Sequence, residues 1–136
     1  MNDRALGLLG IARKGGHVQL GEDPVSAVAQ EGHARLMILA ADAADHTVRR
    51  ANALAALHGT PIVTIENDKA SLGAVFGRSS VAMLAVTDIN LAVHILGGMD
   101  APERYQAQAQ AVCEKAAVMK QRKLSKKRGG KKHAIN

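Results

Sequence analysis

The chain has 136 residues, which suits a single domain, and 47% of them are hydrophobic, which excludes wholesale disorder. Aromatic residues make up only 1%, which argues against proteins that stack nucleic-acid bases on aromatic platforms. The single cysteine, Cys113, excludes an internal disulfide framework and a multi-cysteine zinc site. No apolar run reaches the roughly 18 residues of a membrane span, and the first residues lack a signal-peptide pattern. We therefore expect a cytoplasmic protein with no membrane partner.

The net charge of +6 is divided unevenly along the chain. Of the 18 Lys and Arg residues, eight lie in residues 120–136, which contain no acidic residue; the other ten share residues 1–119 with all twelve Asp and Glu, for a net charge of −2. A block of like charge that contains Gly129-Gly130 cannot bury a face, so we predict a mobile basic tail over residues 120–136. Such a block attracts polyanions without reading their sequence. Its cations are Lys120, Arg122, Lys123, Lys126, Lys127, Arg128, Lys131 and Lys132.

Short apolar runs alternate with helical patterns along the rest of the chain. Four runs predict strands: residues 17–20, 36–40, 62–65 and 81–86, the last three typical of strands that are covered on both faces. Helices are predicted around them: residues 5–13, 23–31, 45–58, 68–77 and 88–97. Residues suited to cap the start of a helix precede or begin four of these helices: Asp23, Asp45, Asp68, and Asp88 or Asn90. Pro24 follows Asp23 at the first helical position, where proline is well tolerated. This order predicts a three-layer α/β/α sandwich with a mixed four-stranded sheet.

A further helix is predicted from Glu103 to about Lys120. Its apolar residues are three or four positions apart and form a narrow stripe that could dock on the body or on another chain: Tyr105, Ala109, Val112, Ala116 and Met119. We therefore divide the chain into a domain over residues 1–98, an added helix over residues 99–119 and the basic tail.

A search for catalytic motifs finds none. The sequence has no phosphate-binding loop of the GxxxxGK[ST] type, no GxGxxG after a strand, no HExxH and no GxSxG. Its six histidines are scattered, and Cys113 has no evident histidine partner. We therefore expect no enzymatic activity, no metal, no cofactor and no small-molecule substrate.

Three polar turns could meet a phosphate backbone. One is the basic turn over residues 13–17, the second leads from Gly21 into a helix N-terminus, whose dipole favours anions, and the third covers residues 77–80. The candidate RNA-binding residues in and beside these turns are Arg13, Lys14, Gly16, His17, Gly21, Glu22, Asp23, Ser26, Arg78 and Ser79.

The glycines in these turns have an order and spacing that resemble the kink-turn-binding ribosomal-protein superfamily, most closely its bacterial YlxQ-type members. The markers are Ala12-Arg13 followed by Gly16, Gly21 before a helix, and Gly32-x-Ala34-Arg35 before an apolar strand that ends at Ala41-Asp42; a later match runs from Gly73 to Asp88. The resemblance covers about residues 4–98 and implies an α/β/α sandwich. It also implies that RNA is gripped by the helix after Gly21 and by the turn before the last strand.

The chain departs from that pattern just after Gly21. Kink-turn binders usually place Asn, Glu and Lys where this chain has Asp23, Pro24 and Ala27. A carboxylate cannot donate to a guanine acceptor, although YlxQ-type proteins commonly carry acidic residues here too.

Two functions follow from these patterns. The first is a non-enzymatic protein that binds structured RNA, in the ribosome or transcription-termination context that the resemblance implies. The second is a protein-interaction module that docks on a ribosomal or transcription-complex partner, with a tail that gives only non-specific attraction to nucleic acid.

Overall fold

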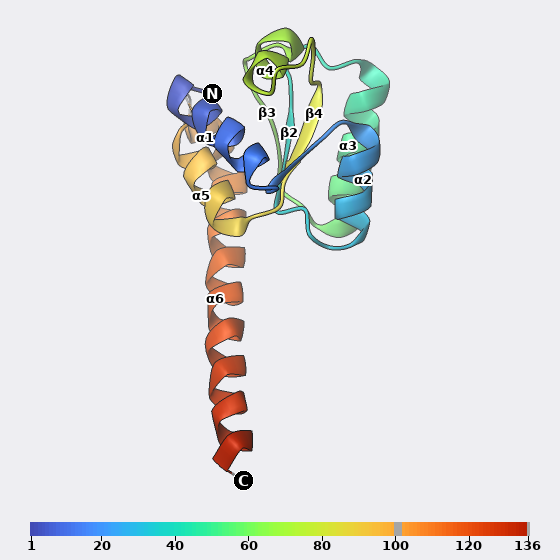
Figure 1. Cartoon of the computed structure of the whole chain (residues 1–136). Coiled ribbons are helices and arrows are strands. Elements are labelled where there is room, and N and C mark those ends of the chain that lie inside the picture. Colours follow the sequence, from blue (N-terminus) through green and yellow to red (C-terminus); the bar gives the residue numbers. More distant parts are fainter. Residues whose placement is uncertain (100–101, 136) are drawn as a thin grey trace.

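The computed structural model describes the backbone of residues 1–99 and 102–135, and the side chains of residues 1–99 and 103–125. Eleven elements follow one another in these residues: α1 (Asp3–Lys14), β1 (Val18–Leu20), α2 (Glu22–Gln30), β2 (Leu36–Leu39), α3 (Asp45–His58), β3 (Ile62–Thr64), α4 (Lys69–Val75), β4 (Met83–Val86), α5 (Ile89–Gly97), the 3₁₀-helix η1 (Pro102–Tyr105) and α6 (Gln106–Ile135). Helices α2 and α3 cover one face of the sheet and α1, α5 and α6 the other (Figure 1). The predicted α/β/α sandwich is confirmed.

The four strands form one mixed sheet in the order β1-β4-β2-β3. Strand β4 pairs antiparallel with both β1 and β2, and β2 pairs parallel with β3. Three of the strands therefore finish at the same end of the sheet, where β4 begins. We call this the Gly21 end, and it holds residues 21–23, 41–45, 66–69 and 76–82. The opposite end holds residues 13–17, 32–35, 58–61 and 87–90, and we call it the His17 end.

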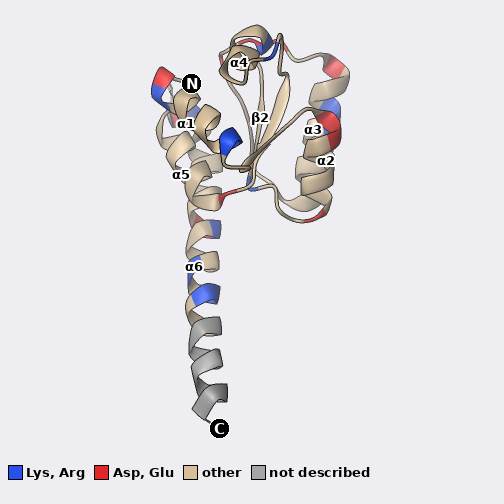
Figure 2. Ribbon diagram, viewed as in Figure 1, with Lys and Arg blue, Asp and Glu red and all other residues tan. Residues whose placement is uncertain are grey.

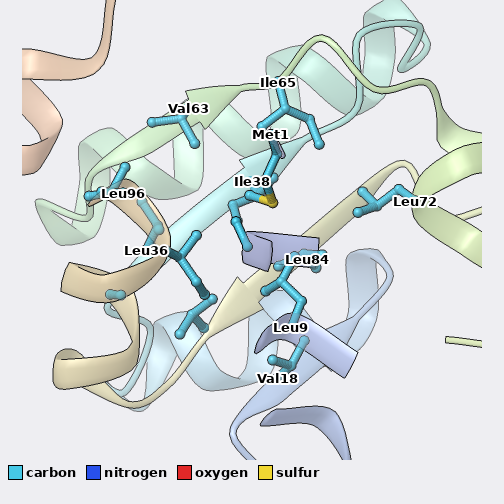
Figure 3. Packing of buried hydrophobic residues seen from close by; sticks show 14 of the residues in the cluster. Met1, Leu9, Val18, Leu36, Ile38, Val63, Ile65, Leu72, Leu84 and Leu96 are labelled. Atoms are coloured by element: carbon cyan, nitrogen blue, oxygen red, sulfur yellow. The ribbon is translucent and has the colours of Figure 1, made fainter. Parts of the chain in front are cut away.

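The core is divided in two by the sheet, because side chains alternate along each strand. On β2, Leu36 and Ile38 pack with α1, α4 and α5, whereas Met37 and Leu39 pack with α2 and α3. The larger cluster gathers side chains from all four strands and the helices above them (Figure 3). Both faces of β2 are fully buried, as the continuous apolar run predicted.

Two of the predicted helix starts are confirmed and two shift by one or two residues. Asp68 and Asp88 cap α4 and α5, each accepting a hydrogen bond from the backbone N–H three residues on. Asp45 is instead the first residue of α3, after Ala44. Asp23 does not cap α2, because Gly21 takes that position with φ +90°, which a residue with a side chain rarely adopts.

The end of η1 and the start of α6 dock on the body and cover the outer edge of strand β3. The hydroxyl of Tyr105 donates to Thr64 O at 2.8 Å, and Nε2 of Gln108 donates to Ile62 O at 3.3 Å, so both side chains satisfy carbonyls of the edge strand β3. Val112 is fully buried, and α6 packs against α5. Of the apolar stripe, Tyr105, Ala109 and Val112 pack against the core of the body.

The predicted end of this helix near Lys120 is wrong, since α6 continues through the basic segment to Ile135. The segment has no proline, and Lys, Arg, Gln and Ala all favour helix. Each glycine of Gly129-Gly130 costs only about 1 kcal/mol in a helix. In the described part of the chain, no helix combines the length and the apolar character needed to cross a membrane.

We predict that Val112 anchors α6 to the body. Val112→Ala should lower the free energy of unfolding by about 2 kcal/mol, because it removes two buried methyl-sized groups and leaves a cavity. Val118→Ala is the matched control in the same helix: Val118 is 45% exposed, so its loss should change stability by less than about 0.5 kcal/mol. Urea denaturation of the full chain measures both, and equal effects would show that α6 is not anchored at Val112.

Candidate nucleic-acid interface

The Gly21 end brings together the two segments that the resemblance assigned to RNA binding. The backbone N–H of Gly21 donates to Met83 O at 3.0 Å, and that of Ala40 donates to Ala82 O at 2.9 Å. These bonds place the start of α2 beside the turn that leads into β4. Gly21, Glu22, Asp23, Arg78 and Ser79 therefore lie at one end of the sheet.

The other sequence-predicted residues lie elsewhere. Arg13, Lys14, Gly16 and His17 lie at the His17 end, because the three residues of β1 separate them from Gly21. Nη1 of Arg13 donates to Val18 O at 2.9 Å, so this guanidinium holds the turn before β1. The sequence-predicted residues thus form two groups rather than one continuous site.

Glu22 is held by α3 rather than presented to solvent. Its carboxylate accepts from Oγ1 of Thr47 at 2.9 Å and from Nη1 of Arg50 at 3.2 Å, and these contacts tie the start of α2 to α3. Sequence reasoning missed Thr47 and Arg50, because only folding brings residues 25 and 28 positions away to Glu22. The charge of Glu22 is therefore offset within the protein.

Asp23 and Ser26 differ sharply in accessibility. The Asp23 side chain is 95% exposed, and its nearest cation is Arg50 at 3.9 Å. An exposed charge pair at that distance is screened by water and contributes little. Ser26 is buried, and its hydroxyl has no hydrogen-bond partner among the described residues. Of the two, only Asp23 faces a ligand approaching from solvent.

The turn over residues 77–80 is built against Gly73. A Cβ on Gly73 would lie 2.8 Å from Arg78 O and 2.8 Å from the Cα of Ser80, closer than a Cβ atom approaches backbone atoms. Arg78 N–H also donates to Gly73 O at 3.0 Å. Glycine at position 73 therefore lets the backbone of the turn pack closely against α4. In this position Arg78, Ser79 and Ser80 are exposed.

The start of α4 is fixed by a charged cap beside this turn. Ser71, mainly through its backbone N–H at 2.7 Å, holds the pKa of the exposed Asp68 carboxyl below its ordinary value of 3.8. A lowered pKa means that the cap stabilises the fold above the ordinary pKa and is lost as pH falls through the lowered value. The support of the turn is therefore intact at neutral pH.

The Gly21 end and α6 carry different charges (Figure 2). Acidic residues mark the starts of α2 and α3 at the Gly21 end, and Arg50 there is paired with Glu22. On α6, Lys115, Lys120, Arg122 and Lys123 are exposed and form no ion pair with another described residue. Lys126, Lys127, Arg128, Lys131 and Lys132 lie outside the described side chains.

The comparisons with known proteins agree with this fold. Residues 3–95 match the model of the Ribosomal protein L7Ae/L30e/S12e/Gadd45 family. Because the match spans well over half of the chain, the protein belongs to this family. The superfamily inferred from the glycine pattern is confirmed. No curated protein matches the sequence.

Two solved structures are similar. One is a protein with unknown function from Bacillus halodurans, with 25% sequence identity and a TM-score of 0.65; the match covers 71% of this chain and 96% of that one. The other is the 15.5kD RNA binding protein of Giardia lamblia, with 21% identity and a TM-score of 0.59; the match covers 75% of this chain and 92% of that one. The second likeness shows the shared fold.

We predict that Gly73→Ala displaces the turn over residues 77–80. The added methyl group meets backbone atoms that cannot rotate away, so the variant should lose about 1–3 kcal/mol of stability. Gly7→Ala is the control, because Gly7 lies inside α1 and an added methyl group would have no neighbour within 4 Å. Alanine there should raise the free energy of unfolding by at most about 1 kcal/mol. Thermal unfolding distinguishes the two, and a Gly73→Ala protein as stable as the native chain would contradict the close contact.

Proposed function

We propose that this chain is a non-enzymatic, cytoplasmic RNA-binding protein of the YlxQ type. It binds structured RNA at the Gly21 end, and its basic helix α6 adds attraction that does not depend on sequence. Its context is the ribosome or transcription termination. Neither a metal, a cofactor nor a small-molecule substrate is part of this proposal.

The family and one structural neighbour support RNA as the partner. The family model includes ribosomal proteins in its description, and the Giardia lamblia neighbour is described as an RNA binding protein. In this chain, the Gly21 end offers backbone that a ligand can approach at Gly21 and a turn with one cation and exposed hydroxyls at Arg78, Ser79 and Ser80.

The observation that carries the proposal is the unpaired charge on α6. Lys120, Arg122 and Lys123 follow the docked part of the helix and are exposed without carboxylate partners among the described residues. Cations left unpaired by the protein are free to replace the counterions of a nucleic acid. The sandwich therefore carries a polyanion-binding helix on a family fold that includes ribosomal proteins.

A protein-interaction module is the second candidate, and the exposed carboxylate of Asp23 favours it. This charge lies where the family would read RNA, and residues 1–119 carry a net charge of −2. If this candidate is right, the body contributes no preference for RNA shape, and only α6 attracts nucleic acid.

We predict that α6 sets the salt dependence of RNA binding. Replacing all eight cations of residues 120–136 by Gln keeps helix propensity, since Gln and Lys are similar helix formers. Each lost contact lowers the slope of log affinity against log salt by about 0.7 on single strands and 0.9 on duplexes, so five contacts change it by about three to five. Fluorescence anisotropy at four salt concentrations measures the slopes. An unchanged slope would show that the basic segment does not contact RNA.

The Gly21 end is tested by Arg78→Glu in the full chain. We expect the preference for a kink-turn RNA over an unstructured RNA of equal length to fall by about tenfold, because one charge-assisted phosphate contact becomes a repulsion. Arg4→Glu is the matched control, an exposed arginine on α1 with the same change of charge. If the native chain prefers neither the kink-turn nor any other structured RNA over the unstructured one, the protein-interaction function is favoured.

A further inference from the structure

The His17 end holds a small pocket whose cations form no ion pair with another described residue. The pocket measures about 180 Å³ and lies where β2 begins, α3 ends and α6 passes. Its lining includes Arg35, His58 and Lys115, together with Gly32, Gly59 and Thr60, and no carboxylate. Sites for drug-sized ligands measure about 300–1,000 Å³, so this one suits a group of the size of a phosphate.

Arg35 lines this pocket, and its side chain makes one hydrogen bond to another described residue. Its Nη1 donates to Gly32 O at 3.2 Å in an exposed contact, while Nε is buried and has no acceptor among the described residues. A buried donor without an acceptor is costly, and such groups commonly mark the place of an ion or a water. The guanidinium makes one hydrogen bond to another described residue, the bond to Gly32 O, and an anion in the pocket would supply two further acceptors to it.

The nearby carboxylates do not neutralise these cations. Glu31 lies 3.5 Å from Nδ1 of His33, and Glu114 accepts from Nε2 of Gln110. Neither carboxylate lines the pocket, and within the described side chains neither Arg35 nor Lys115 has an ion-pair partner. Arg50, near the Gly21 end, differs because its guanidinium is paired with Glu22.

We propose that this pocket binds a backbone phosphate of RNA, with Arg35 and Lys115 as its charged donors and His58 beside them. The inference rests on the proposed RNA-binding function and gives it a second contact at the end of the sheet opposite to Gly21. Lys115 lies on α6, so the helix that lines one side of the pocket also carries the exposed cations Lys120, Arg122 and Lys123. An RNA strand seated in the pocket therefore continues along α6.

A structural role for the same cations makes a different prediction. The pocket lies at the C-terminal ends of α2 and α3, where helix dipoles favour positive charge. If Arg35 and Lys115 serve only these helix ends, their removal lowers the melting temperature and leaves RNA affinity unchanged.

The test is the double variant Arg35→Gln with Lys115→Gln in the full chain, binding a single-stranded RNA. Loss of two phosphate contacts should lower the salt slope by about 1.4 and weaken binding several-fold at low salt. The charge-matched control is Arg4→Gln with Arg49→Gln, two exposed arginines that have no ion-pair partner among the described residues, and its slope should stay within about 0.3 of the native value. A double variant with the native slope overturns the proposal.

Two further measurements keep the result decisive. If the double variant unfolds, Lys115→Gln alone replaces it, because Lys115 is exposed and its loss should spare the fold; the slope should then fall by about 0.7. If the native chain binds no RNA, the proposed function fails, and inorganic phosphate tests the pocket by itself. Saturable shifts of the Gly59 and Thr60 amide signals would support a phosphate site there, and their absence would exclude it.

Discussion

Strand β4 lies inside the sheet and pairs antiparallel with β1 on one side and with β2 on the other, and this pairing fixes which loops share an end of the sheet. It brings Gly21 to Met83 and Ala40 to Ala82, so the start of α2 and the turn after α4 become neighbours although they are far apart in the sequence. At the other end it brings the N–H of Arg35 to Val86 O and the N–H of Thr87 to His17 O. The two candidate RNA-binding regions are therefore products of one register.

Charge also distinguishes the two ends of the sheet. At the Gly21 end, the starts of α2 and α3 carry carboxylates, and Arg50 beside them is paired with Glu22. In the pocket at the His17 end and along α6, Arg35 and the lysines stay unpaired within the described side chains. Because α6 also contacts the edge of β3 through Gln108 and buries Val112 against the body, it is at once part of the fold and a carrier of charge. Val112 therefore fixes the docked part of α6 on the body, and the basic segment continues from it in the same helix.

Much of this fold was predictable from the sequence, because strands buried on both faces read as unbroken apolar runs and capped helices begin at Asp68 and Asp88. The glycine spacing also predicted the family. The length of α6 was not predicted, because the block of like charge suggested a mobile segment. The segment contains no proline and is rich in residues that favour helix, and these features determine its structure. The grouping of the site was only partly predictable. Arg13 is close to Gly21 in the sequence, but a strand lies between them, and the contacts of Glu22 with Thr47 and of Lys115 with the Arg35 pocket arise only when distant helices pack.

The most direct test of the account is to map amide chemical shifts while a structured RNA is added to the full chain. The account predicts perturbed signals in two groups, one at Gly21, Arg78 and Ser79, and one at Arg35, Gly59 and Lys115 that continues along α6. The two groups should move together at low salt, and the α6 signals should return toward their free positions first as salt is raised, because those contacts are the most exposed. Perturbation confined to residues 120–136, with neither end of the sheet affected, would contradict the account.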